Sequence, residues 1–151
     1  MSWLTPDVQG VSHLSSGVLP RAFLDVLKDY PGLDTALLND FVTYKQTGIP
    51  SDRFGRDAPY VWPAAAFNAN LMHIHLKLPP EKFPKNLPQI DRVCRRGAPE
   101  KDAALVYVRG ELEEHRYCHL AVLYPDGHAR AREEKLMRYL ARLAQKFRGE
   151  N

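Results

Sequence analysis

The sequence predicts a single α+β domain built around an antiparallel β-sheet, and three observations lead to this prediction. The chain has 151 residues, a length typical of one domain with a sizeable core. Residues 71–78 alternate between apolar and polar side chains, as a half-buried strand does. Residues 103–109 and 116–124 also alternate, and the short segment between them begins with Gly110, which favours an antiparallel hairpin.

The first thirty residues have the weakest pattern. Residues 1–19 contain Ser, Gly and scattered apolar side chains without a period, so we expect a flexible N-terminal extension before a domain at 20–151. Residues 20–29 are ambiguous, because their apolar side chains fit both a helical stripe and an alternating strand.

An amphipathic helix is predicted from Leu33. Leu33, Leu37 and Phe41 recur at helical spacing, and we expect them to face the core. Gly48 suits the left-handed position after the last turn, and Pro50 prevents the helix from continuing.

Residues 53–63 are expected to form a loop, because one glycine and two prolines interrupt any helix or ladder there. This loop carries Arg56 and Asp57. The strand that follows places His73, His75 and Lys77 in a row, about 6–7 Å apart, on the face opposite its apolar side chains.

The second half of the chain is more basic than the first. Residues 79–102 form a long proline-rich connection whose Lys and Arg side chains suit either phosphate contact or a solvated surface. Pro125-Asp126-Gly127 predicts a turn, and the last helix is expected to begin just after it. From His128 to Arg148, seven Lys or Arg side chains stand against two Glu.

The composition indicates a cytoplasmic protein. No apolar run is long enough to span a membrane, and the N-terminus lacks the features of a signal peptide. Cys94 and Cys118 lie far apart without metal-ligand spacing, as expected for thiols in a reducing compartment.

If the most apolar face of each strand points to one core, the remaining side chains collect on one opposite surface. That surface would be basic and would carry aromatic and histidine side chains. Its members would be His73, His75, Lys77, Tyr107, Arg109, Tyr117 and His119.

Such a surface suits RNA, because aromatic rings stack on unpaired bases and Arg or Lys neutralise phosphate. RNA carries its own nucleophile, so cleavage needs only positioning, a base, an acid and donors for the phosphorane. Histidine serves as base or acid near neutral pH, and arginine holds two phosphate oxygens. Asp57 would more naturally orient a neighbour.

Two other interpretations of the histidines stay open. His73 and His75 share one face and His119 could join them as a third metal ligand, but Lys77 and Arg109 on that face disfavour a dication. We therefore expect no metal. The histidines could also be exposed strand residues without a role.

The order of several motifs is similar to that of the YafO family, toxins of type II toxin–antitoxin modules. The resemblance covers residues 20–148. The motifs in the first half are Asp40–Gly48, Phe54-Gly55-Arg56-Asp57-Ala58, Trp62-Pro63 and His73-Ile74-His75-Leu76. Those in the second half are Leu105-Val106-Tyr107, Gly110, Pro125, His128, Ala131-Arg132, Met137 and Phe147-Arg148.

The resemblance implies a ribosome-dependent mRNA endonuclease that is neutralised by a cognate antitoxin. It also implies a RelE-like sheet with helices on one face and RNA on the other, working without metal or cofactor. Because the family begins with a strand where residues 20–28 lie, the expected order is β–α–β–β–β–α. The expected partners are the antitoxin, the ribosome and mRNA, with no membrane contact.

The chemistry above assigns roles to individual residues. Arg56, Asp57, His73 and His75 are predicted to be catalytic, although Arg56 and Asp57 could instead pair with each other and fix the loop. The alternative function is a non-catalytic module that blocks translation by occupying the ribosome. The predicted RNA-binding residues are Lys77, Tyr107, Arg109, His119, His128 and Arg132.

Overall fold

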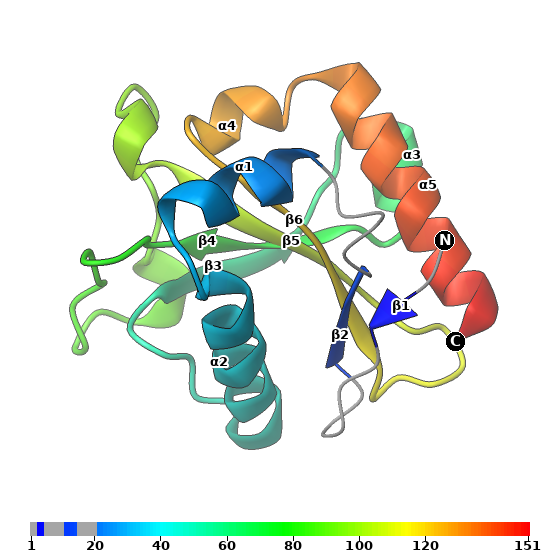
Figure 1. Cartoon of the computed structure of the whole chain (residues 1–151), viewed down its shortest axis with the longest axis horizontal. Coiled ribbons are helices and arrows are strands. Elements are labelled where there is room, and N and C mark those ends of the chain that lie inside the picture. Colours follow the sequence, from blue (N-terminus) through cyan, green and yellow to red (C-terminus); the bar gives the residue numbers. More distant parts are fainter. Residues whose placement is uncertain (1–2, 5–10, 15–20) are drawn as a thin grey trace.

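The computed structural model describes residues 3–4, 11–14 and 21–151. Its six strands form one sheet in the order β1-β2-β6-β5-β4-β3 (Figure 1). β3 to β6 are antiparallel neighbours, whereas β2 runs parallel to β6. The α+β class, the antiparallel sheet and its hairpin are therefore confirmed. The strands are β1 (Trp3–Leu4), β2 (Val11–Leu14), β3 (Phe54–Pro59), β4 (Met72–Leu76), β5 (Ala103–Arg109) and β6 (Tyr117–Leu123).

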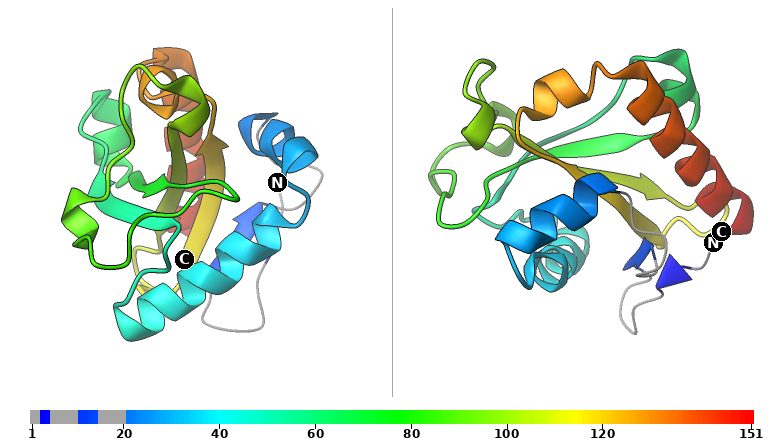
Figure 2. Two further views of the ribbon diagram at one scale, coloured as in Figure 1. Left: turned by 90° about the vertical axis from the view of Figure 1, so that its left-hand side faces the viewer. Right: turned by 45° about the horizontal axis from the view of Figure 1, so that its top comes forward.

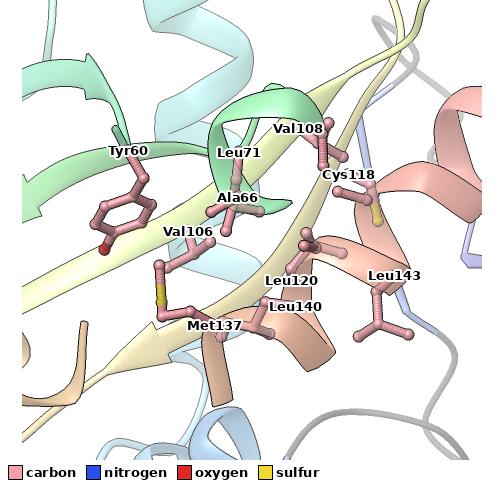
Figure 3. Close-up of a cluster of buried hydrophobic side chains, with 14 of the residues drawn as sticks. Tyr60, Ala66, Leu71, Val106, Val108, Cys118, Leu120, Met137, Leu140 and Leu143 are labelled. Atoms are coloured by element: carbon pink, nitrogen blue, oxygen red, sulfur yellow. The ribbon is translucent and has the colours of Figure 1, made fainter. Parts of the chain in front are cut away.

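Helices cover both faces of the sheet, so the expectation that they cover one face is wrong (Figure 2). One face, here the α2 face, packs against α1 (Arg21–Asp29) and α2 (Leu33–Thr47). The other, the α5 face, packs against α3 (Ala64–Asn68) and α5 (Glu134–Glu150), and Figure 3 shows its buried side chains.

The predicted helix from Leu33 is α2. Leu33, Leu37 and Phe41 are buried against the sheet, as their spacing indicates. Gly48 has φ 74° and donates its N–H to the Tyr44 carbonyl over 2.7 Å, which closes the last turn.

Residues 20–28 do not form the strand that the resemblance implied, because Arg21–Asp29 is helix α1. Val26 of α1 is buried in the cluster of the α2 face, so the helical stripe describes this segment correctly. The strand beside β6 is instead β2, within the predicted N-terminal extension. The rest of that extension, residues 1–2, 5–10 and 15–19, lies outside the described residues.

The predicted loop at 53–63 is wrong in its first half, because Phe54–Pro59 forms the edge strand β3. A register shift between Phe54 and Asp57 absorbs the irregular residues, and Pro59 ends the strand. Gly55 is required where it stands. A Cβ there would collide with the Arg92 carbonyl and the Phe83 ring.

The connection at 79–102 contains two short 3₁₀ turns, η1 (Gln89–Asp91) and η2 (Pro99–Lys101). It is not merely a solvated loop. Arg92 is buried, and its guanidinium donates to the carbonyls of Phe54 and Leu87 over 3.2 and 2.8 Å. The segment around Arg92 thereby covers the outer edge of β3.

The last helix is divided in two. α4 (Gly127–Arg130) follows the predicted turn, and α5 begins only at Glu134. His128 therefore lies on α4 and not at the N-terminus of the long helix. No helix in the described ranges has the length and apolar character needed to cross a bilayer.

Candidate functional site

The predicted single polar surface is wrong, because its members divide between the two faces of the sheet. In the sheet Met72 is opposite Tyr107, whereas His73 is opposite Val106. Tyr107 therefore shares a face with the apolar side of β4, and His73 lies on the other face. A register shift in β6 adds a second break in alternation, and Val122 joins a different core cluster from Leu120.

A cleft of about 890 Å³ opens on the α2 face. Its volume falls within the range of small-molecule sites, large enough for a nucleotide. Residues from the end of α2, from β3 and from β5 line it, together with the C-terminal part of α5. Four cationic side chains line the cleft: Lys45, Arg56, Arg109 and Arg148. Three carboxylates line it as well, those of Asp57, Glu111 and Glu114.

Asp57 holds a cluster of polar side chains together within this cleft. Its carboxylate accepts hydrogen bonds from the hydroxyls of Tyr44 over 2.8 Å and Tyr107 over 2.7 Å. Lys45 Nζ lies 3.5 Å from the same carboxylate. Burial, with Asp57 as a further cause, raises the pKa of Tyr44 to about 12 and raises the pKa of Tyr107 as well. Both phenols therefore stay protonated as donors at neutral pH.

Arg56 is exposed at the margin of the cleft. Its Nε donates to the Ile90 carbonyl over 2.7 Å, which fixes the guanidinium against η1. The alternative in which Arg56 and Asp57 pair with each other is wrong, because the two side chains have different partners.

His73, His75 and His128 form what we call the histidine row on the α5 face. The ring centroids of His73 and His75 are 5.7 Å apart, and those of His75 and His128 are 5.6 Å apart. Tyr60 stacks on His73 at 4.0 Å with an interplanar angle of 12°. These side chains surround a small recess of about 40 Å³. The structure thus brings His128 beside the two strand histidines.

The two strand histidines are neutral at pH 7. Burial lowers the pKa of His73 to about 4, and His75 and His128 add repulsion. Burial also lowers the pKa of His75 to about 4, with further repulsion from His128 and Arg56. His75 is therefore within electrostatic reach of both Arg56 and His128.

Asp102 anchors the end of the row. Its carboxylate lies 2.8 Å from His128 Nδ1, and the Asp102 side chain is only 2% exposed. His75 Nδ1 accepts the Cys94 backbone N–H over 3.0 Å. Each of these two rings thus has one nitrogen engaged by the protein.

The remaining predicted residues are dispersed. Lys77 lies over the Phe83 ring, and Arg132 is exposed after α4. His119 is fully buried against Phe41, with ring centroids 4.7 Å apart, so in this conformation it contacts the core and not a ligand. Among the residues that the structure describes, no three His, Cys, Asp or Glu side chains are placed to hold a metal ion.

Several site residues were missed from the sequence. Tyr44 and Lys45 lie near the end of α2, and the helical spacing of its apolar side chains does not mark either as a site residue. Asp102 precedes an apolar strand, and a carboxylate at that position was the available signal. Gln89, which donates to the Tyr44 hydroxyl over 3.0 Å, gave none.

The comparisons with known proteins agree with this sequence pattern. Residues 42–149 match the family model described as "Toxin YafO, type II toxin-antitoxin system". The chain is 36% identical over 117 residues to the mRNA interferase toxin YafO of Escherichia coli (strain K12), covering 75% of this chain and 83% of that protein. No solved structure matches significantly. The chain belongs to the YafO family of toxins from type II toxin–antitoxin systems.

Proposed function

We propose that the protein is an mRNA interferase, a metal-independent endoribonuclease that cleaves mRNA on the ribosome. The observation that carries this proposal is the position of Arg56, which lines the cleft described above and also acts electrostatically on His75. The name of the Escherichia coli relative supports the same activity.

Cleavage in this proposal uses the 2′-hydroxyl of the RNA. O2′ loses its proton and attacks phosphorus, the P–O5′ bond breaks, and O5′ takes up a proton. The products are a 2′,3′-cyclic or 3′-phosphate and a 5′-hydroxyl. Because no external nucleophile is needed, the protein has only to position the phosphate, move protons and stabilise negative charge.

Arg56 holds the scissile phosphate in this mechanism. The residue is exposed, its Nε is held by the Ile90 carbonyl, and no further hydrogen-bond or ion-pair partner of its side chain occurs among the described residues. Lys45 and Arg109 extend the positive potential along the cleft. Asp57 keeps the cleft wall in shape through its two tyrosine partners.

The histidine row supplies acid–base chemistry in this proposal. His75 is its central member, and His73, stacked under Tyr60, supports it. A bound phosphate carries negative charge, which favours the protonated imidazole and raises the low pKa of His75 when RNA arrives. The row therefore becomes effective as a proton carrier only in the complex.

Primer extension on mRNA from expressing cells tests the function. New 5′ ends that disappear in the His73→Ala/His75→Ala double variant support an endonuclease, whereas translational arrest with intact mRNA supports a module that blocks the ribosome by occupancy. Cleavage by EDTA-treated, metal-free protein supports metal independence. Loss of cleavage under EDTA, restored by a divalent cation, contradicts it.

We also propose that the antitoxin presents an acidic or amphipathic segment to α5. The exposed side of α5 carries Lys135, Arg138, Arg142 and Lys146. Tight association with so basic a surface requires a partner of complementary charge. An Arg138→Glu/Arg142→Glu variant should lose co-purification with the product of the neighbouring gene, while Lys82→Glu/Lys85→Glu on the 79–102 connection should keep it. Unchanged co-purification of the first variant would contradict this contact.

A further inference from the structure

The buried carboxylate of Asp102 fixes His128, one histidine of the row. Asp102 Oδ2 accepts the backbone N–H of His128 over 3.0 Å and lies 2.8 Å from its ring Nδ1. The Asp102 carbonyl also accepts the N–H of Gly127 over 2.9 Å. Because the main chain and the ring of His128 are bound to one oxygen, the orientation of the imidazole is fixed.

This contact determines which ring nitrogen is available for chemistry. A carboxylate accepts a hydrogen bond, so the nitrogen next to it carries the proton. The neutral ring of His128 then has its proton on Nδ1 and its lone pair on Nε2. The imidazole side chain is 27% exposed and the Asp102 side chain only 2%, so solvent reaches the ring but not the carboxylate behind it.

The surroundings of His128 contain several other titratable groups. Asp102 lies just before β5, His73 and His75 come from β4, and Tyr60 follows β3. Arg56 acts on the same group of rings through its effect on His75. Asp102 is the anion in direct contact with His128, and no other carboxylate among the described residues lines this recess.

We infer that Asp102 is a positioning residue that prepares His128 as the general base of RNA cleavage. In the reaction, which rests on the function proposed above, His128 Nε2 takes the proton of the 2′-hydroxyl as O2′ bonds to phosphorus. The P–O5′ bond breaks, O5′ takes the proton carried by His75, and both imidazoles are then restored by proton exchange with solvent. Asp102 stabilises the imidazolium formed on the way and stays ionised.

A purely structural role is the competing explanation. Asp102 also joins η2 and β5 to the start of α4, and this anchoring would persist without any proton transfer. The two roles differ in what the charge does. Anchoring needs an acceptor oxygen, which asparagine also provides, whereas control of the tautomer and stabilisation of an imidazolium need the carboxylate.

The test compares Asp102→Asn with the parent in single-turnover cleavage of mRNA on ribosomes. We expect near-parent thermal unfolding and ribosome binding, and a cleavage rate lower by roughly 10²–10⁴-fold, the usual range for general base catalysis. His128→Gln should lose as much, and the double variant should lose no more than either single one. His115→Gln, an exposed histidine on the β5–β6 connection, is the matched control and should keep the parent rate.

A second measurement does not depend on RNA. Nitrogen NMR of the imidazoles should show His128 of the parent protonated at Nδ1 and a changed tautomer ratio in Asp102→Asn. Parent rate and parent tautomer in that variant would overturn the inference. If the parent protein itself does not cleave mRNA, the proposed function falls, while the tautomer still decides the positioning: Nδ1–H supports it and Nε2–H overturns it.

Discussion

The Asp57 cluster in the cleft and the histidine row on the opposite face both gather titratable side chains, but they differ in how well these are satisfied. In the cluster, the Asp57 carboxylate has partners in Tyr44, Tyr107 and Lys45. In the row, His73 Nδ1 is buried without a hydrogen-bond partner among the described residues. The row also has two rings with lowered pKa values.

The difference indicates that the Asp57 cluster and the histidine row have different roles. A buried polar group with all its partners stabilises one conformation, whereas an unsatisfied one costs stability and needs another reason to persist. Burial, the neighbouring rings and Arg56 oppose protonation of these imidazoles, and a bound anion would favour it. The cluster therefore fixes the wall of the cleft, whereas in the function proposed above the row gains a partner when a phosphate binds.

The largest expected effect separates activity from stability. Arg56→Ala removes a charge-stabilising donor and should lower the cleavage rate on the order of 10²–10³-fold. Because Arg56 is exposed, the unfolding free energy of the variant should be less than about 1 kcal/mol below that of the parent. Single-turnover cleavage and urea unfolding of the same preparations measure both. A folded variant that cleaves at the parent rate would remove Arg56 from the site.

Asp57→Ala should lower stability more than it lowers the cleavage rate of the folded protein. It leaves the hydroxyl of Tyr107, a side chain only 2% exposed, without its acceptor and frees Tyr44 as well. An unsatisfied buried group costs about 1–3 kcal/mol, and Tyr44 costs less than Tyr107 because it is only half-buried, so we expect the unfolding free energy to fall by about 2–4 kcal/mol. Urea unfolding measures this. If stability is unchanged while folded protein loses all cleavage, Asp57 belongs to the chemistry instead.

The unfolding free energy of the protein should depend on pH through the histidine row. The folded pKa values of His73 and His75 are about 4, below the unfolded value of 6.5, so the unfolded chain binds more protons between these pH values. The contribution of neutral histidines is thus complete above pH 6.5 and is lost as pH falls towards 4, by roughly 1–3 kcal/mol for each ring.

Urea unfolding at pH 7, 6 and 5 checks this dependence. His73→Gln removes one titrating ring and should flatten the decline, whereas His115→Gln on the exposed connection should leave it as in the parent. Equal slopes for both variants would show that His73 is not the buried neutral ring described above.

The smallest effect concerns Lys45. Its ammonium is 3.5 Å from Asp57 and partly exposed, so Lys45→Gln should cost less than about 1 kcal/mol of unfolding free energy. The same variant should reduce the dependence of RNA binding on salt concentration, because one fewer cation faces the phosphates. Titration at several ionic strengths measures it, and an unchanged salt dependence would place Lys45 outside the RNA path.

Local pattern predicted the elements well and their faces poorly. The helix from Leu33, the strands β4 to β6 and the hairpin follow from period and turn residues. The common polar surface failed because β5 and β6 are apolar on both sides, since helices cover both faces, and because a bulge near Leu120 interrupts alternation. The alternation of apolar and polar residues along a strand does not reveal a bulge or show which face each side chain occupies.

The site shows the same limit. Arg56, His73 and His75 could be proposed from the sequence because polar and basic side chains at regular spacing stand out there, and their roles stay predictions. Asp102 could not be proposed, since its meaning lies in a contact with His128, 26 positions later, that only the tertiary fold creates. Segment 20–28 was misassigned because the resemblance outweighed a helical stripe that described it correctly.

The cover over β3 bears on how a partner can approach. Edge strands invite pairing with a strand of another chain, and many peptide ligands bind in that way. Here the Arg56 N–H is already bonded to the Arg92 carbonyl over 2.9 Å, and Gln89 occupies the Gly55 carbonyl. A ligand that extended the sheet at β3 would first have to displace residues 89–92 and uncover the Arg92 guanidinium. Strand addition at this edge is thereby disfavoured, both for a peptide and for a second copy of the chain.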